Sequence, residues 1–510
     1  MTMRRRDFLR LSGMSAAAFA LGAAEKPQPA RRNILFIMAD QFRFEWIGAR
    51  GARFLRTPNL DALAANGVLF TRAVSNSPVC ASSRVSLAAG VYGNRLGAYA
   101  NGSAFYPAQA NGFPELLPSF YNVLAANGYR TGIAGKCDLS KGRPPKLAPG
   151  QQASVMTSDS RSGFPLTREL GFTDSWVIPK WSGEYLQQLF GRKDLREIYR
   201  EDEKKRALSN PSPALPPCAL PDEFYYEHVL GRKAVEVLDT FHKEDPTRPW
   251  FFHVNFHSPH PPHDAPRQYL DMYEGVEFPP PAVAQEPNRN RTARKNITSA
   301  ILHRIQQHYA AMITLDDEWI GKLIATLKKN GQYENTVILF SSDHGEMLGD
   351  FGLFAKNQMY EGSLRVPLII SGPGVTARGQ SRALAELVDL YPTILDLAGL
   401  GHGRAKLDGK SLAPLLAGKS REHKEYQYSE WGPASEPPYA QRRMVFDGRY
   451  KLIDAHASLE LYDLDADPRE TRNVAEENGN TVTKLKAVMK TYSEGALPPQ
   501  AFGSDPEAAD

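Results

Sequence analysis

The sequence predicts an α/β fold, with a large mixed, mainly parallel sheet sandwiched by helices and a smaller C-terminal antiparallel sheet subdomain. Two observations favour the large sheet. Short apolar runs alternate with helix-like segments along most of the chain, and these runs lack the apolar–polar alternation of a half-exposed strand. Strands that are apolar on both faces need helices on both sides. A change to short strands and tight turns after residue 420 indicates the second unit.

The elements of the large sheet are expected in a regular order. A helix that Thr57-Pro58 opens and Gly67 closes separates the first two strands, and another helix ends at Gly128. The expected strands are residues 33–39, 68–70, 129–134, 250–255 and 336–340, and the other expected helices are residues 117–127 and 297–329. The carboxyl ends of parallel strands share one edge of a sheet, so a functional site is expected there.

The C-terminal part, residues 421–510, is expected to form an α+β subdomain beside a catalytic domain of residues 25–420. Its expected strands are residues 426–431, 443–446, 450–453 and 459–462, followed by a helix over residues 482–492. Three segments look like surface insertions: residues 141–152, residues 192–206 with 210–221, and residues 278–295. Charge runs of this kind are usually solvated faces, and we assign them no function.

The N-terminus predicts a signal peptide over residues 1–24. A charged segment that contains Arg5-Arg6 precedes a short apolar stretch and a zone of small residues. This order is typical of a secretory signal and is too short to span a bilayer. The twin-arginine pair predicts export of the folded protein by the Tat machinery, to the periplasm or the extracellular space.

Composition excludes several classes of protein. With 42% hydrophobic residues in 510, the chain can bury a large core, which excludes a disordered or fibrous protein. Of the net charge of +4, the first 24 residues supply +3, so the remainder is nearly neutral and we expect no nucleic-acid partner. No other stretch approaches about 18 apolar residues, so no stable membrane anchor is expected. Three cysteines are too few for a disulfide framework.

Two strand ends carry candidate metal ligands. Asp40 and Gln41 follow the first strand directly, and Asp343-His344 follows the strand near residue 340. An aspartate at a strand end often only caps the next turn, but two such ends can converge on one ion. Oxygen ligands favour a hard cation such as Ca²⁺ or Mg²⁺.

Cys80 is the candidate nucleophile. It lies in a polar turn at a predicted helix start, four residues before Arg84, where a positive field favours thiolate or oxyanion chemistry. The alternative is a small buried cysteine without a chemical role.

These residues carry a resemblance to a known family. The segment Cys80-Ala-Ser-Ser-Arg84, preceded by Pro78-Val79, resembles the signature of type I sulfatases, in which the cysteine is oxidised to Cα-formylglycine. Other segments match the family's motifs in the same order: residues 33–41, 135–136, 259–262, 343–346, 356–361, 366–367, 386–392 and 461–468. The resemblance implies a fold of the alkaline phosphatase type and a formylglycine-generating maturase as a partner.

The family's mechanism implies a role for each matching residue. Formylglycine at Cys80 would act as a hydrated diol that attacks sulfur and later expels sulfate. The implied Ca²⁺ ligands are Asp40, Gln41, Asp343 and His344. Arg84 would orient the diol, Lys136 and Lys356 would neutralise sulfate oxygens, and His260 would protonate or hydrogen-bond the leaving oxygen. Less firmly matched substrate-binding candidates are Ser83, Asp138 and His257. Of the four histidines at positions 253, 257, 260 and 263, most are expected to be solvated.

Three positions depart from the family's pattern. Ser82 replaces the usual proline or alanine of the signature, which bears on recognition by the maturase. Asp138 stands where the family commonly has a histidine, and its carboxylate would repel sulfate unless a proton or a lysine neutralises it. Phe351 stands where Gly-Asp-His-Gly is frequent in the family, so a possible substrate contact is lost.

The sequence thus predicts an exported sulfuric ester hydrolase acting on a sulfated carbohydrate or a small sulfate ester. One alternative is a phosphodiester or phosphonate monoester hydrolase of the same superfamily, because the same site accepts other tetrahedral anions. A second alternative is a pseudoenzyme that binds sulfated glycans without turnover, motivated by Ser82 and Asp138. The sequence names neither a sugar nor a linkage.

Overall fold

A computed structural model of the chain describes most of its residues. The described residues are 31–101, 118–139, 171–177, 183–204, 206, 215–285, 296–401, 406–433, 440–455, 458–494 and 496. The predicted signal peptide of residues 1–24 and the predicted insertion of residues 141–152 lie outside them. Within this described part, no helix combines the length and apolar character needed to cross a membrane.

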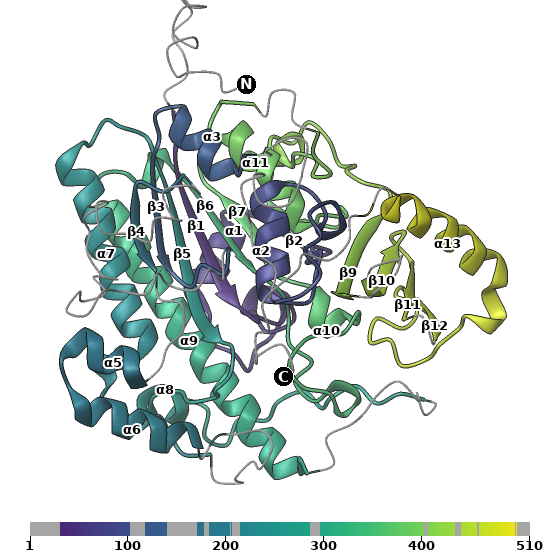
Figure 1. Cartoon of the computed structure of the whole chain (residues 1–510), viewed down its shortest axis with the longest axis horizontal. Helices are drawn as coiled ribbons and strands as arrows, with labels where there is room; N and C mark the ends of the chain where they lie inside the picture. The colour runs from purple at the N-terminus through teal and green to yellow at the C-terminus, as the bar shows by residue number, and fades with distance from the viewer. Residues whose placement is uncertain are drawn as a thin grey trace, which may run out of the picture. The chain divides into compact units, whose positions relative to one another are not determined.

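An eight-stranded sheet forms the centre of the fold (Figure 1). Its strands are β1 (Asn33–Asp40), β2 (Gly67–Phe70), β3 (Arg130–Gly135), β4 (Asp174–Val177), β5 (Trp250–Pro259), β6 (Thr336–Ser342), β7 (Leu368–Ser371) and β8 (Gly379–Ser381). Their order is β4-β3-β5-β1-β6-β7-β2-β8. Only β7 runs antiparallel to its neighbours, β6 and β2. The prediction of a mixed, mainly parallel sheet is confirmed.

Helices cover the sheet on both sides. The helices of this part of the chain are α1 (Pro58–Ala65), α2 (Cys80–Ala89), α3 (Phe120–Ala126), α5 (Gly183–Phe190), α6 (Lys193–Lys204), α7 (Tyr226–Glu244), α8 (Arg267–Asp271), α9 (Ser299–Lys329), α10 (Glu361–Leu364), α11 (Leu390–Leu397) and α12 (Ala413–Leu416). The first strand shows the two layers. Leu35 and Ile37 join a core cluster with α7 and α9, whereas Phe36 and Met38 join another with α2, α3 and α11. Successive side chains of a strand point to opposite faces, so residues 34–39 of β1 are apolar on both faces.

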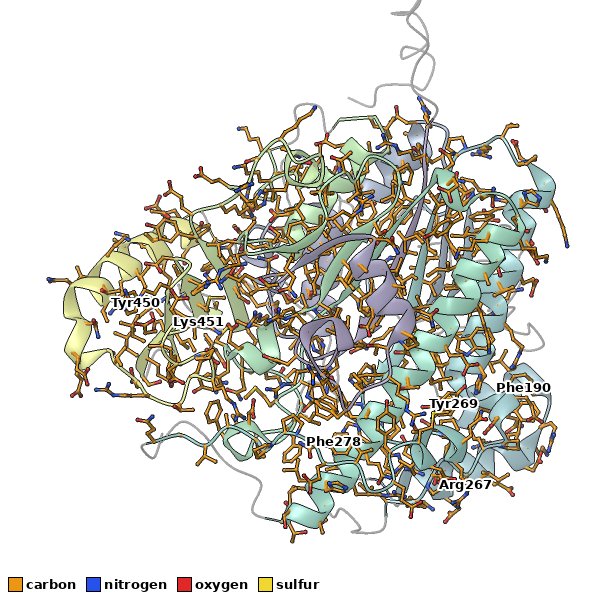
Figure 2. All side chains as sticks on the ribbon, turned by 180° about the vertical axis from the view of Figure 1, so that it is seen from behind. Phe190, Arg267, Tyr269, Phe278, Tyr450 and Lys451 are labelled. Carbon is orange, nitrogen blue, oxygen red and sulfur yellow. The ribbon has the colours of Figure 1, made fainter. Side chains whose placement is uncertain are left out.

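The second unit is a four-stranded antiparallel sheet of β9 (Gln427–Pro433), β10 (Ala440–Phe446), β11 (Tyr450–Asp454) and β12 (Leu459–Asp463), in the order β12-β11-β10-β9. Helix α13 (Gly479–Ser493) contacts β10 and β11. Figure 2 labels Tyr450 and Lys451 on this sheet, on β11. The predicted antiparallel subdomain is present, while the domain boundaries at residues 24 and 420 stay predictions.

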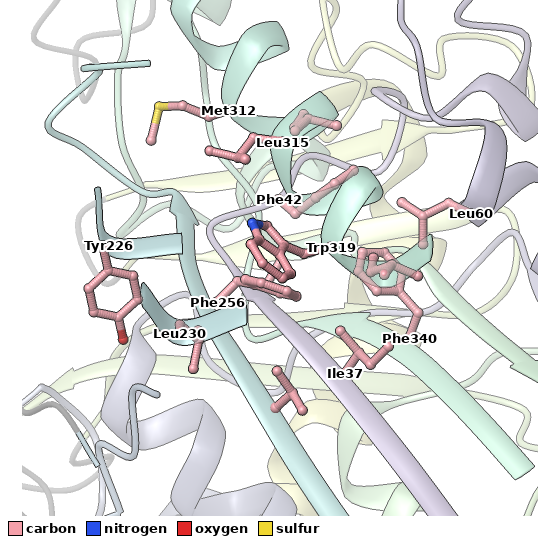
Figure 3. Packing of buried hydrophobic residues seen from close by; sticks show 14 of the residues in the cluster. Ile37, Phe42, Leu60, Tyr226, Leu230, Phe256, Met312, Leu315, Trp319 and Phe340 are labelled. Carbon is pink, nitrogen blue, oxygen red and sulfur yellow. The ribbon is translucent and has the colours of Figure 1, made fainter. Parts of the chain in front are cut away.

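Aromatic side chains fill the space between the sheet and α9. Figure 3 shows Trp319 of α9 among Phe42, Phe256 and Phe340, all of which are buried. The ring of Phe42 meets that of Phe340 edge-on at a centroid distance of 5.5 Å. Because Phe42 comes two residues after Asp40, this packing holds the end of β1 against α9.

The sequence predicts a solvated face for the charge run of residues 192–206. The structure shows instead that part of this segment is buried. Most of it forms α6, which buries Leu195 and Tyr199 on one side. Asp202 and Arg206 are only 4% exposed each and form an ion pair with a 2.9 Å N–O distance. A helix whose apolar residues recur every three or four positions can carry many charges and still pack against a core.

Candidate active site

The predicted metal-binding residues meet at the carboxyl ends of two adjacent parallel strands. Asp40 ends β1 and Gln41 follows it, while Asp343 and His344 follow β6. His344 Nε2 lies 3.7 Å from Asp40 Oδ1 and 3.6 Å from Asp343 Oδ1. All four residues are buried. Neighbouring parallel strands end at the same edge, which is why residues some 300 positions apart converge here.

The conformation of Gln41 suits a cation. Its φ of 68° is unusual for a residue other than glycine, and its backbone N–H donates to Asp343 Oδ1 at 3.1 Å. The side-chain Nε2 donates to Glu346 Oε2, while Oε1 is buried and meets no hydrogen-bond donor among the described residues. A buried oxygen without a donor is costly unless something positive faces it. Gln41 is therefore suited to ligate a metal ion through Oε1.

His344 is also arranged as a ligand. Its Nδ1 lies 3.0 Å from the carbonyl oxygen of Gly345, and since a carbonyl only accepts, Nδ1 carries the proton. The Nε2 lone pair then faces the carboxylates of Asp40 and Asp343. Two carboxylates, one amide oxygen and one imidazole nitrogen form a donor set that fits a divalent cation.

Cys80 is the first residue of α2 and lies against this cluster. Its Sγ is 3.2 Å from His344 Nε2, 3.0 Å from Lys356 Nζ and 3.7 Å from Asp40 Oδ1. Burial and the charge of Asp40 raise the pKa of the thiol, but opposing charges, chiefly those of Lys136 and Lys356, outweigh them, so that the pKa of Cys80 lies below its ordinary value. The side chain is thus placed for chemistry next to the metal-ligand set.

Arg84 lies one helical turn after Cys80 and is 3% exposed. Its Nε donates to Asp343 Oδ2 at 2.9 Å and its Nη1 to Asn255 Oδ1 at 2.7 Å. Burial lowers the pKa of this guanidinium, but Asp343 and Asp40 overcome that effect and raise it. Arg84 therefore stays charged and holds the carboxylate of Asp343 in place.

Lys136 and Asp138 follow β3, the strand next to β5, and form a pair. Lys136 Nζ lies 3.2 Å from Asp138 Oδ2 and also contacts Asp40 Oδ2. Burial lowers the pKa of Lys136, but Asp138 and Asp40 outweigh burial and hold it well above its ordinary value. Lys136 thus neutralises the carboxylate of Asp138. A proton or a lysine is required there if the carboxylate is not to repel sulfate, and the structure provides the lysine.

The histidines at positions 253, 257, 260 and 263 are less solvated than predicted. His253 lies inside β5 at 3% exposure, stacked on Phe36 with ring centroids 4.4 Å apart, and His263 is 5% exposed. His257 and His260 are partly buried, with ring centroids 4.9 Å apart. Strand β5 extends to Pro259 and so includes residues that the sequence assigned to a loop.

His260 and His257 are neutral at neutral pH. Burial and the charge of Lys136 lower the pKa of His257 to about 4. Burial and the charge of Lys356 hold the pKa of His260 well below its ordinary value. His260 Nδ1 lies 2.6 Å from the carbonyl oxygen of Pro261, so it carries the proton and leaves Nε2 as an acceptor.

The remaining predicted positions have contacts within the protein. Ser83 Oγ donates to the carbonyl oxygen of Asp343 at 2.6 Å, and Ser82 Oγ to that of Ala98 at 2.5 Å. The Phe351 ring packs on Tyr360 with centroids 5.2 Å apart. Lys356 meets the Cys80 sulfur, as described above. The catalytic, substrate-binding and metal-binding roles of all these residues stay predictions.

Sequence reasoning missed two residues of the site. Asn255 accepts from Arg84, and Glu346 accepts from the side chain of Gln41. Asn255 is the polar residue at the end of the expected strand of residues 250–255, a signal similar to the strand-end position that singled out Asp40. Glu346 had no local signal beyond its place in the segment that follows β6.

Comparison with known proteins agrees with this geometry. The family model Sulfatase matches residues 32–400, and the model N-sulphoglucosamine sulphohydrolase, C-terminal, matches residues 349–494. A choline-sulfatase of Rhizobium meliloti is 31% identical over 463 residues, covering 87% of this chain and 82% of the relative. An arylsulfatase of Clostridium perfringens is 28% identical, covering 91% of this chain and 94% of the relative. The crystal structure of a phosphonate monoester hydrolase of Agrobacterium radiobacter has a TM-score of 0.71 and 27% identity, covering 91% of this chain and 95% of that one.

These matches place the fold in the alkaline phosphatase superfamily. Within that superfamily, the chain belongs to the sulfatase family, because the family model spans most of its length and curated sulfatases align along nearly all of it. The protein is a sulfuric ester hydrolase.

Proposed function

We propose that this enzyme releases sulfate from a sulfated carbohydrate or a small sulfate ester at a nucleophile formed from Cys80. The observation that carries the proposal is the position of Cys80 Sγ, within hydrogen-bonding distance of both Lys356 Nζ and His344 Nε2 and beside Asp40. A nucleophile in contact with cations and with a metal-ligand set suits attack on a tetrahedral anion.

Asp40, Gln41, Asp343 and His344 would hold Ca²⁺, or Mg²⁺ in its place. The bound ion would supply positive charge that polarises a sulfate oxygen and favours the deprotonated nucleophile. The donor-free oxygen of Gln41 and the inward Nε2 of His344 support this assignment. Arg84 keeps Asp343 oriented through its 2.9 Å bond.

The other side chains would bind and orient the substrate. Lys136 and Lys356 carry the ammonium groups closest to Asp40 and Cys80, and they would neutralise sulfate oxygens as point charges. His260, whose free Nε2 accepts, would take a proton from a hydroxyl group and return it to the leaving oxygen. Ser83, Asp138 and His257 would contribute to the surroundings of the bound ester.

Oxidation of Cys80 to formylglycine is part of the proposal and is directly measurable. Mass spectrometry of the peptide that contains Cys80 should show a shift of about −18 Da when the protein is produced with a maturase. Cys80→Ala should abolish sulfate release, whereas Cys218→Ala, at a distant half-buried cysteine, should retain it. An unmodified thiol in protein from the native host, together with no sulfate release from a panel of glycan and small esters, would overturn the proposal.

A second activity is supported by the similarity to the phosphonate monoester hydrolase. The same metal and nucleophile would accept a phosphodiester or a phosphonate monoester as another tetrahedral anion. Comparing kcat/KM for an aryl sulfate, an aryl phosphodiester and an aryl phosphonate measures which transition state the site stabilises. A preference for either phosphorus ester over the sulfate would reassign the main activity.

Export belongs to the proposal as well. The twin-arginine segment would send the folded enzyme to the periplasm or outside the cell, after maturation in the cytoplasm. Replacing Arg5 and Arg6 together by lysine should leave the enzyme and its activity in the cytoplasmic fraction. Unchanged export of that variant, or a cytoplasmic pool that holds only unmodified Cys80, would contradict this part.

A further inference from the structure

Lys356 lies in a loop with an unusual backbone. The residues on either side of it, Ala355 and Asn357, have φ angles of 61° and 72°. Residues other than glycine rarely adopt this left-handed conformation, and they keep it only where surrounding contacts impose it. The position of Lys356 Nζ, 3.0 Å from Cys80 Sγ, therefore depends on what holds this loop.

Hydrogen bonds from several segments hold the loop. The backbone N–H of Ala355 donates to Glu346 Oε1 at 2.5 Å, and the Ala355 carbonyl oxygen accepts from the backbone N–H of Met347 at 2.8 Å. The backbone N–H of Asn357 donates to the carbonyl oxygen of Pro78 at 3.2 Å. A further contact comes from the four-stranded sheet. Arg442 of β10 donates through Nη1 to the carbonyl oxygen of Asn357 at 2.8 Å and to Gln358 Oε1 at 2.6 Å.

The surroundings of Arg442 show that its charge is directed at this loop. Its guanidinium carbon lies 5.4 Å from the centroid of the Trp431 ring on β9. Burial lowers the pKa of Arg442, while the charge of Glu460 acts against that shift. Among the described residues, the hydrogen bonds of this half-buried guanidinium go to two neutral oxygens of one loop, so that it acts as a clamp on that loop.

We propose that Arg442 is a positioning residue for the reaction: the four-stranded sheet, through Arg442, fixes the loop of residues 355–358 so that Lys356 stays beside the nucleophile. The consequence for catalysis rests on the proposed function, in which Lys356 neutralises a sulfate oxygen. The inference that Arg442 holds the loop is independent of the proposed function. Both residues lie in the segment matched by the C-terminal family model, residues 349–494.

The next residue along β10 provides a matched control. Arg443 points to the opposite face of the strand, where it pairs with Asp454 at 2.7 Å and donates to Ser493 at 3.3 Å. Arg443→Gln therefore removes an arginine and an ion pair from the same sheet without touching the loop. Arg442→Lys keeps the charge but offers a single ammonium in place of the planar fork.

Hydrogen–deuterium exchange tests the structural part without any substrate. Arg442→Gln should speed exchange of the amides of residues 355–358, whereas Arg443→Gln should not. Equal exchange of these amides in wild type and Arg442→Gln would overturn the proposal, whether or not the enzyme hydrolyses sulfate esters.

A double-mutant cycle tests the catalytic part. Arg442→Gln should lower kcat/KM for an aryl sulfate by about 10- to 100-fold, because a displaced charged group no longer meets the reacting anion, and Arg442→Lys should lower it less. In a Lys356→Gln background, Arg442→Gln should cost no more than about twofold, because the two residues act through one contact. If the double variant loses the product of the two single-variant losses in kcat/KM, Arg442 acts independently of Lys356 and the proposal is overturned. A loss of kcat/KM in Arg443→Gln equal to that in Arg442→Gln would also overturn it. If wild type turns over no sulfate ester, the proposed function fails while the exchange result still decides the structural part.

Discussion

The carboxylate of Asp138 lies 3.2 Å from the ammonium group of Lys136, and that ammonium group also contacts Asp40. Lys136 therefore shares its charge between Asp40, a proposed metal ligand, and Asp138, which stands where the family commonly has a histidine. This sharing explains how a carboxylate can stand beside a site that binds an anion.

Removing the charge of Asp138 should strengthen substrate binding. In Asp138→Asn, Lys136 loses one of its two anionic partners, so the site becomes more positive toward a sulfate ester. We expect KM for an aryl sulfate to fall by about 3- to 10-fold, as Coulomb interactions at such distances allow. Asp138→Glu keeps the charge and should change KM little. A KM that rises or stays constant in Asp138→Asn would contradict this explanation.

Glu346 should control metal affinity through Gln41. Its Oε2 accepts from Gln41 Nε2, so that the buried Oε1 atom of Gln41, which has no donor among the described residues, stays available to the proposed metal ion. Glu346→Leu removes that acceptor, so we expect the affinity for Ca²⁺, measured by calorimetric titration, to fall by about 10- to 100-fold.

Two further variants make the Glu346 test specific. Glu346→Gln preserves the shape of the side chain and should give a smaller loss than leucine. Glu334→Gln, at an exposed position just before β6, should bind Ca²⁺ like wild type. Undiminished affinity in a folded Glu346→Leu protein would show that the amide of Gln41 needs no such support.

Lys451 should be a major determinant of stability. It is fully buried on β11, and its Nζ lies 2.8 Å from Glu361 and 2.8 Å from Glu470. Lys451→Met leaves two carboxylates without their buried partner, and we expect it to lower the free energy of urea-induced unfolding by about 3–5 kcal/mol. Arg449→Met breaks a pair with Asp463 and a cation–π contact with Tyr450 at the surface, and it should cost far less. Similar losses for the two variants would be inconsistent with this difference.

Glu430 should make stability depend on pH. It is 2% exposed on β9, and burial raises its pKa from 4.5 to about 8. The folded state therefore keeps a proton that the unfolded state releases at lower pH. Because the folded state binds more protons in this range, stability should fall as pH rises from about 4.5 to 8.

The variant Glu430→Gln isolates this contribution. Glutamine has nearly the same shape but does not ionise, so the loss in unfolding free energy between pH 5 and pH 8 should be smaller than in wild type. Urea titrations at the two pH values measure it. Parallel losses in both proteins would assign the pH dependence to other groups.

Local patterns in the sequence were sufficient for the main elements of the fold. The apolar run that became β1 and the run that became β6 predicted buried parallel strands, and their acidic ends predicted a shared site. Patterns were insufficient for β5, whose last residues were assigned to a proline-rich loop, because pairing with β1 extends it to Pro259. The charge run of residues 192–206 was also misjudged, since a helix can bury one face whatever its total charge.

The sequence by itself thus determined the sheet, the antiparallel C-terminal unit and the candidate residues at the strand ends, because each depends on periodicity or on neighbours along the chain. Only the tertiary structure decided that Lys136 pairs with Asp138, that Glu346 orients Gln41, and that Arg442 reaches the loop of Lys356. The orientation of Gln41 and the clamp on the Lys356 loop join side chains from distant segments. In each of these three contacts, the partner depends on how the folded chain brings the side chains together, and a local sequence pattern does not predict that.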